Sequence, residues 1–326
     1  MAATATKPVI TTKPKAVSVT TPAAKKAVVQ PQRAPSFRIE TAHTKARYMK
    51  GLIYGEYGTG KTRLLSTSIG VQDMRDVLMI DAEAGDMTLM DDTSEFAFDK
   101  IDTVLVQNYK QVAAVQEFLK SHCRLRESGM TDDLDKLIAL EARFRGIDPK
   151  DVEKPRKYRT VILDSLSEIE SMCMYQLLGI SAVTRLDEEV ASAEWAEYKK
   201  QNAMVQRLIR GFRDLPMHVL ITCASKYAQD DQKKMLYGPA LTGQLSRQVQ
   251  GFMDVVGYLV IGQAENENDP LPRRLYVQPV KGQRFNAKCR FSSFKGSYFD
   301  NPTMGTILET VGLISALSPK TKGDKK

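Results

Sequence analysis

The residues with the clearest chemistry stand in the stretch GEYGTGKT, from Gly55 to Thr62. It fits the pattern G-x-x-x-x-G-K-[ST], in which glycines let backbone N–H groups turn inward around phosphate oxygens. We expect Lys61 to reach the β- and γ-phosphates of a nucleotide and the Thr62 hydroxyl to coordinate Mg²⁺. The residues predicted to bind ATP are Gly55, Glu56, Tyr57, Gly58, Thr59, Gly60, Lys61, Thr62 and Arg63.

An acid that supports the Mg²⁺ is expected at the end of a neighbouring strand. The apolar run Val161-Ile162-Leu163 ends in Asp164, which is therefore the second predicted metal ligand beside Thr62. The alternative is that Asp164 caps the helix expected to begin near Leu166, because aspartate favours helix N-termini. The uninterrupted apolar run before Asp164 favours the metal site.

Hydrolysis also needs a group that orients and polarises the attacking water. Asp164 is followed by Ser165 and not by a glutamate, so this group must come from another strand end. The run 77–80 ends in Asp81-Ala82-Glu83, and we predict Glu83 as the catalytic carboxylate. The alternative is an ordinary turn with a solvated acid. The chain has only three histidines, which gives little support to histidine-based catalysis.

Short apolar runs and helical stretches alternate along the chain after residue 47. Wholly apolar runs of this length are typical of central parallel strands covered on both faces. The strands are predicted at 48–54, 77–80, 103–106, 161–163 and 218–221, and the helices at 109–121, 131–145, 166–179 and 187–214. This alternation predicts an α/β fold with a doubly wound, mainly parallel sheet.

Two further features complete the predicted fold. The runs 254–260 and 274–277 indicate an added antiparallel pair at one edge of the sheet. In the helix 187–214, the large apolar side chains are expected to face the core, as the helical period requires. These side chains are Trp195, Met204, Leu208 and Phe212. Segment 121–157 has no predicted function.

Positive charge gathers at the two ends of the chain. Residues 1–50 hold ten Lys or Arg and one acid, and residues 319–326 hold four Lys and one acid. Since the whole chain carries +8, the remainder is about −4. The ends lack the apolar surface that folding requires, so we predict a disordered basic tail at 1–40, an ATPase domain at 41–318 and a basic tail at 319–326. Such tails either track a phosphate backbone or serve only for solubility.

The sequence shows no apolar run long enough for a membrane span and no apolar core of a signal peptide. Its four cysteines are far apart and form no C-x-x-C pair, which is typical of reduced thiols and argues against a zinc site. We therefore expect a cytoplasmic protein, in the host cytoplasm if a phage encodes it, without a membrane partner.

Three motifs together resemble the RecA-like P-loop ATPases over about residues 48–290. VLMIDAEAGD (77–86) is similar to the RecA strand that ends in the catalytic glutamate, and VILDS (161–165) to its second nucleotide motif. Order and spacing resemble the phage Sak-type single-strand-annealing proteins in particular. The resemblance implies a RecA-like core, ATP and Mg²⁺ as ligands, and single-stranded DNA as a partner.

The resemblance also implies roles for residues further along the chain. Segment 280–286 resembles the Lys/Arg element that RecA, RadA and DnaB-type helicases insert into a neighbour's nucleotide site, which would make Lys281 and Arg284 catalytic in trans. Self-association through the nucleotide interface would follow. The alternative is a basic turn at the surface. Where RecA has a glutamine that senses the γ-phosphate, this chain has Thr222 to Ser225, so Thr222 and Ser225 are the candidates.

RecA-like proteins bind single strands through loops after the second and third nucleotide strands. The second loop would be 225–239, whose mixed Lys and Tyr residues suit backbone neutralisation and base stacking. The alternative is a flexible polar surface loop.

The predicted function is ATP hydrolysis, stimulated by DNA, in phage recombination, annealing or replication. A single-strand-binding protein is a further predicted partner. A ring-forming remodeller or helicase loader, and a nucleotide-gated DNA-binding scaffold, remain the alternative functions.

Overall fold

The computed structural model describes most of the chain between Tyr48 and Leu313. The described residues are 48–85, 87–90, 96–128, 131–181, 184–185, 187–190, 192–229, 235–263 and 270–313. They all belong to the unit that runs from Ala46 to Lys326. The predicted tails 1–40 and 319–326 and both boundaries of the predicted domain 41–318 lie outside the described residues.

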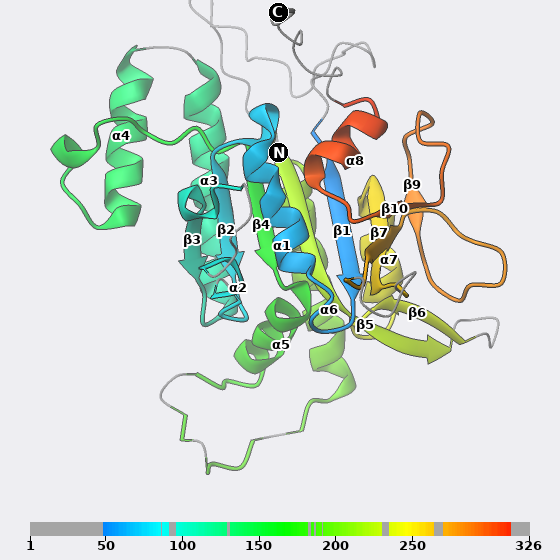
Figure 1. The fold of residues 1–326 in the computed structure, drawn as a ribbon. Coiled ribbons are helices and arrows are strands. Elements are labelled where there is room, and N and C mark those ends of the chain that lie inside the picture. Colours follow the sequence, from blue (N-terminus) through cyan, green and yellow to red (C-terminus); the bar gives the residue numbers. More distant parts are fainter. Residues whose placement is uncertain are drawn as a thin grey trace, which may run out of the picture. The chain divides into compact units, whose positions relative to one another are not determined.

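The described residues form one ten-stranded sheet in the order β10-β8-β7-β1-β5-β4-β2-β3, with β6 paired to β5 and β9 to β7 (Figure 1). The six strands from β7 to β3 run parallel to their neighbours, while β6, β8, β9 and β10 pair antiparallel. The bounds are β1 Lys50–Gly55, β2 Val77–Asp81, β3 Asp102–Leu105, β4 Thr160–Asp164, β5 His218–Gln229, β6 Met235–Pro239, β7 Val255–Ile261, β8 Arg273–Tyr276, β9 Lys288–Cys289 and β10 Tyr298–Asp300. The predicted mainly parallel sheet with an antiparallel edge is confirmed.

Helices cover both faces of the sheet. The helices are α1 Lys61–Ser66, α2 Met87–Met90, α3 Tyr109–Ser128, α4 Thr131–Arg145, α5 Leu166–Leu177, α6 Trp195–Arg213, α7 Leu245–Phe252 and α8 Met304–Thr310. Short 3₁₀ turns lie at Thr67–Gly70, Gln72–Met74, Phe98–Lys100 and Pro149–Asp151. Among the described helices, none combines the length and the apolar character needed to cross a membrane.

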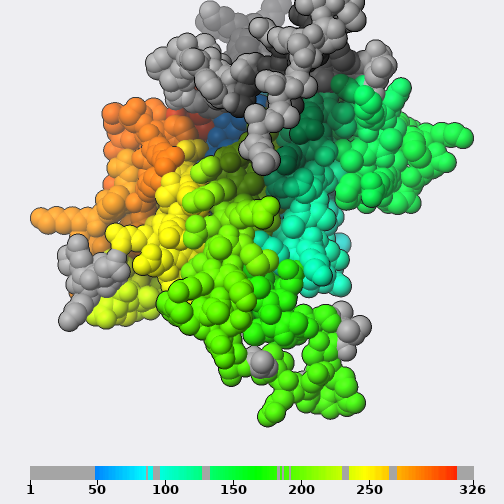
Figure 2. All heavy atoms as spheres, turned by 180° about the vertical axis from the view of Figure 1, so that it is seen from behind, coloured from blue at the N-terminus to red at the C-terminus, as the bar shows by residue number. Residues whose placement is uncertain are grey.

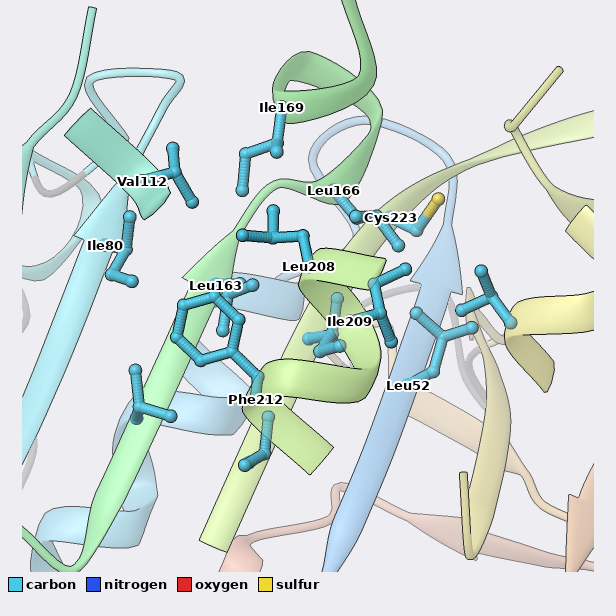
Figure 3. Packing of buried hydrophobic residues seen from close by; sticks show 14 of the residues in the cluster. Leu52, Ile80, Val112, Leu163, Leu166, Ile169, Leu208, Ile209, Phe212 and Cys223 are labelled. Carbon is cyan, nitrogen blue, oxygen red and sulfur yellow. The ribbon is translucent and has the colours of Figure 1, made fainter. Parts of the chain in front are cut away.

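Two separate hydrophobic clusters show why the central strands carry apolar side chains on both faces. Alternate strand residues face opposite sides, so Leu52 and Ile80 pack with α5 and α6 (Figure 3), while Ile53 and Met79 pack with α1 and α8. Figure 2 shows the side covered by α5 and α6, in green, and by α7, in yellow. Because both faces are covered, the carboxyl ends of the parallel strands are left as the place where polar side chains gather.

Three local predictions are wrong. Strand β3 is an edge strand and not a central one: its side chains alternate in exposure, and Leu105 is 56% exposed. The helix expected at 187–214 begins only at Trp195, which is 74% exposed instead of facing the core. The residue types predict that both segments are apolar. Whether a side chain is exposed depends instead on whether its strand lies at the edge of the sheet, or on whether it lies at the end of its helix.

The predicted loop 225–239 is largely a β-hairpin. Strand β5 continues to Gln229 and pairs antiparallel with β6, from Ser225 opposite Pro239 to Gln229 opposite Met235. Its tip, 230–234, lies outside the described residues.

In segment 121–157, α3 is longer than expected and α4 packs against it.

Candidate functional site

The predicted phosphate loop joins β1 to α1, as the motif requires. Gly58 and Gly60 have φ values of 75° and 88°, a conformation that glycine adopts without strain. The Thr59 hydroxyl donates to the Glu56 carbonyl at 2.8 Å, and the Lys61 ammonium donates to the carbonyls of Gly55 and Glu56 at 3.0 and 2.8 Å. Lys61 therefore lies folded over the loop that it would serve.

Strand β7 fixes the loop from one side. A Cβ atom added to Gly55 would lie 2.3 Å from the Leu259 carbonyl oxygen, so a side chain at this position has no room. The first glycine of the motif is thus required by the close approach of β7 to the end of β1.

Two hydroxyl groups donate to the carboxylate of Asp164, the predicted metal ligand. The Thr62 hydroxyl donates to Asp164 Oδ2 at 2.7 Å, and the Thr222 hydroxyl donates to Oδ1. Thr222 lies on β5, which is the direct neighbour of β4, so its side chain can reach the carboxylate at the end of β4. Asp164 does not cap α5; Ser165 is the N-cap residue, and its hydroxyl accepts from Glu168 N at 3.4 Å.

Glu83 lies beside this carboxylate. Its side chain accepts a hydrogen bond from the Ser165 hydroxyl, which joins the turn after β2 to the residue that follows β4. The register places Asp81 opposite Asp164. The buried Asp81 carboxylate accepts from the backbone N–H groups of Glu83 and Gly85 at 3.0 and 3.1 Å. Asp81 therefore shapes the turn that presents Glu83.

Burial dominates the electrostatics of this cluster. It raises the pKa of Asp164, and the hydrogen bonds from Thr222 and Thr62 oppose that rise. It lowers the pKa of Lys61, against the attraction of the Glu83 and Asp164 carboxylates. A hydroxyl, a carboxylate and an ammonium group held together in a half-buried position match the oxygen ligands that Mg²⁺ prefers and the cation that a phosphate needs.

The two candidates for sensing the γ-phosphate have different surroundings. Thr222 is fully buried and its hydroxyl is committed to Asp164. The Ser225 hydroxyl instead donates to the carboxylate of Glu56 in the phosphate loop. Ser225 is thus the one of the two that touches the loop.

Lys281 and Arg284 lie apart from the cluster. Both side chains are exposed in the segment after β8. The Arg284 carbonyl accepts from Tyr237 N at 2.8 Å, and the next residue, Phe285, packs on Tyr258 and Tyr276. Among the described residues, neither side chain forms a hydrogen bond or an ion pair with Lys61, Glu83 or Asp164 of the same chain.

The hairpin β5–β6 borders a cavity of about 620 Å³ together with α7. The part of its lining that the structure describes contains the cations Lys226 and Arg247 and several amides, but no carboxylate. The Lys226 ammonium donates to the Leu241 carbonyl, and Tyr227 packs on Tyr237 with ring centroids 4.7 Å apart. Tyr227 stays 46% exposed.

The sequence patterns did not predict three of these contacts. Thr222 donates to Asp164, and Asp81 shapes the turn that presents Glu83. Arg273 places its guanidinium against Gly60. Thr222 stands at the end of an apolar run, and that was the only available signal. The other two depend on contacts between strands that are distant in sequence.

The chain matches the model of a known protein family. The model of a family described as "AAA domain" matches residues 47–291. A search of the curated proteins found no match.

Two solved structures resemble the chain weakly. A KaiC-like protein from the hyperthermophilic archaeon Pyrococcus horikoshii is 14% identical, with a TM-score of 0.38, covering 74% of this chain and 82% of its own. The RadB recombinase is 14% identical, with a TM-score of 0.32, covering 70% of this chain and 79% of its own. Since the family model spans most of the chain, including the phosphate loop, Glu83 and Asp164, this protein belongs to the AAA domain family.

Proposed function

We propose that this protein is a RecA-like P-loop ATPase that hydrolyses ATP with Mg²⁺ and acts on single-stranded DNA in phage recombination, annealing or replication. The observation that carries the proposal is the convergence on Asp164. Thr62 and Thr222 both donate to its carboxylate, and Glu83 is held next to it through Ser165. Membership of the AAA domain family supports the nucleotide chemistry.

The roles follow from these positions. Loop 55–63 would hold the phosphates, with Lys61 turning from the loop carbonyls to the β- and γ-phosphates. Thr62 and Asp164 would hold Mg²⁺, which neutralises charge on those phosphates. Glu83 would accept a proton from the attacking water, because it is the carboxylate beside the metal site that is not itself a predicted ligand. Lys281 and Arg284 would supply positive charge to a neighbour's site.

Support for the DNA partner comes from the carboxyl edge of the sheet. The hairpin presents the exposed ring of Tyr227 on one face, while its neighbour Lys226 lines the cavity together with Arg247 of α7. Trp195, at the start of α6, is 74% exposed, with the Lys199 ammonium 5.5 Å from its ring centre. Exposed aromatic rings next to cations suit single strands, because bases stack on the rings while cations neutralise phosphates.

Trp195 allows a direct binding experiment, since it is the only tryptophan of the chain. We expect single-stranded DNA to quench its fluorescence in a salt-dependent manner. Tyr227→Ala should weaken binding by about 1–3 kcal/mol, the typical loss of one base-stacking contact. Phe144→Ala, which removes an exposed aromatic on α4, far from the hairpin in Figure 1, is the control and should bind normally. Unchanged binding in Tyr227→Ala would remove the hairpin from the DNA interface.

The functional test is the ATPase rate with and without single-stranded DNA over a range of protein concentrations. The rate per subunit should rise with DNA and with concentration, and a rate that saturating DNA leaves flat would contradict the proposal. Glu83→Gln should bind ATP but not turn it over. If that variant still anneals strands, the protein is a nucleotide-gated scaffold; closed rings with a protein partner would instead favour a remodeller or helicase loader.

A further inference from the structure

Arg273 lies directly against the phosphate loop of its own chain. A Cβ atom added to Gly60 would be 2.8 Å from Arg273 Nε and 2.9 Å from its Cζ. Gly60 has a φ of 88° and precedes Lys61, the residue predicted to reach the phosphates. The missing side chain at Gly60 therefore leaves the space that the guanidinium occupies.

The sheet explains how a residue more than two hundred positions away reaches the loop. Strand β7 runs parallel to β1, with Tyr258 opposite Tyr54, and continues beyond the last residue of β1. Strand β8 returns antiparallel and places Arg273 opposite Ile261. Ile261 is three residues further along β7 than Tyr258, so Arg273 stands beyond the end of β1, at the level of the loop.

The backbone of Arg273 is held on its other side. Its N–H donates to Asn301 Oδ1 at 2.9 Å, and its carbonyl accepts from Asn301 N at 2.6 Å. The side chain therefore starts from a fixed position, as a contact residue of a binding site requires.

The neighbouring arginine shows what is distinctive about Arg273. Arg274 points to the other side of the strand, where it donates to both oxygens of Asp300, at 2.7 and 3.1 Å, and stacks on the Tyr298 ring. Among the described residues, no carboxylate makes an ion pair with Arg273. Arg274 is thus held by Asp300, whereas the guanidinium of Arg273 lies against the phosphate loop.

We propose that Arg273 is a nucleotide-binding residue that acts in cis, donating from its guanidinium to the phosphates held by loop 55–63. The inference rests on the proposed function, because it assumes a nucleotide at that loop. Guanidinium groups suit this task, since they keep their charge and donate two parallel hydrogen bonds to phosphate oxygens. Arg273 is distinct from Lys281 and Arg284, which would serve a neighbouring subunit.

The test measures binding and not turnover. Binding of a fluorescent ATP analogue is followed by its fluorescence, and binding of ATP itself is measured by calorimetry. Arg273→Ala should weaken ATP binding about tenfold, the usual effect of losing a charge-assisted hydrogen bond. Arg273→Lys should recover part of this loss, because it keeps the charge but not the paired donors. Binding should also become less sensitive to salt, since one cation fewer meets the phosphates.

Arg274→Ala is the matched control, one residue away and paired with Asp300. It should bind ATP like the unaltered protein, and thermal melting of all variants should show that they are folded. Unchanged ATP affinity in Arg273→Ala would overturn the inference. Tighter binding would overturn it too, because it would mean that Arg273 only covers the empty loop.

Lys61→Ala separates this inference from the proposed function. If Lys61→Ala loses ATP binding while Arg273→Ala keeps it, only the role of Arg273 fails. If the unaltered protein binds no ATP, the proposed function fails and the role of Arg273 fails with it.

Discussion

At the scale of single residues, the charge of Asp164 depends on hydroxyl groups from a helix, α1, and from a neighbouring strand, β5. Burial raises the pKa of this carboxyl, and the donors Thr222 and Thr62 counteract the rise. Thr62 would be needed for the metal itself, so Thr222 is the residue whose main contribution is to keep the ligand ionised and oriented. Groups that orient metal ligands in this way commonly change metal affinity by 10–100-fold.

We predict that Thr222→Val weakens Mg²⁺ binding. The variant keeps the shape of the side chain but leaves Asp164 Oδ1 without its donor, so the pKa of Asp164 rises further. A proton then competes with the metal up to a higher pH. The Mg²⁺ concentration for half-maximal ATP turnover should increase about tenfold, and by more at pH 6 than at pH 8.

Thr222→Ser is the control for this prediction, because it restores the hydroxyl. It should return the half-maximal Mg²⁺ concentration close to that of the unaltered protein. Equal Mg²⁺ dependence of the Val and Ser variants would show that the bond to Asp164 has no influence on the metal.

At the scale of elements, the contact between β7 and the end of β1 holds the phosphate loop. Gly55 lies against the Leu259 carbonyl, and Gly257 lies between Leu275 and Ile53, so the strands pack without space for added atoms. Backbone atoms cannot move aside as a flexible side chain can.

We predict that Gly55→Ala destabilises the protein and disturbs the loop. The new Cβ would lie 2.3 Å from the Leu259 oxygen, so β1 and β7 must separate. A cost of about 1–3 kcal/mol in the free energy of unfolding is expected from such overpacking, measured by urea denaturation. Gly58→Ala meets no atom within 4 Å and should lose only about 1 kcal/mol, from its φ of 75°. Equal losses in both variants would contradict the packing argument.

The strand ends show what the sequence alone could predict. Asp81 and Asp164 each follow an apolar run, and parallel strands bring such ends to one edge, so the meeting of Glu83 with Asp164, the predicted metal ligand, was foreseeable. Arg273 was not, because its place depends on the return of β8 along β7. The exposure of Trp195 was not foreseeable either, since an amphipathic period does not show where the helix begins.

At the scale of the whole molecule, the buried histidine His218 couples folding to pH. His218 begins β5, and its Nδ1 accepts from the backbone N–H of Met49, beside β1. Burial, with the nearby charges of Lys50 and Arg159, lowers the pKa of His218 to about 4. The folded state therefore favours the neutral ring.

We predict that stability falls as the pH drops below 6.5 towards 4, because the unfolded chain binds a proton at His218 that the folded chain does not. With the ordinary pKa of 6.5, the contribution of His218 to this loss is about 2.5 kcal/mol at pH 4.5. The measurement is urea denaturation at pH 7 and pH 4.5. His218→Gln keeps an acceptor without the titration, so its stability should change less between the two pH values. A loss of the same size in both proteins would exclude His218 as the cause.

The self-association expected from Lys281 and Arg284 can be tested without knowing the assembly. Arg284 is exposed, and its backbone is tied to Tyr237, so it is presented at the surface. Glu83→Gln removes the proposed base of a site, and Arg284→Ala removes the cation given to a neighbour. Each variant alone should be almost inactive, since a supplied arginine typically contributes 10³–10⁵ in rate.

Mixed in equal amounts, the two variants should regain activity. A site with Glu83 intact on an Arg284→Ala subunit, next to a Glu83→Gln subunit that still carries Arg284, is complete. In random assembly this holds for about one interface in four, so roughly a quarter of the normal rate is expected if the cation acts in trans. Lys295→Ala, which removes an exposed lysine elsewhere, replaces Arg284→Ala in the control mixture. A mixture no more active than its parts would place Arg284 outside the neighbour's site, leaving Arg273 as the arginine from the added antiparallel strands that lies against the phosphate loop.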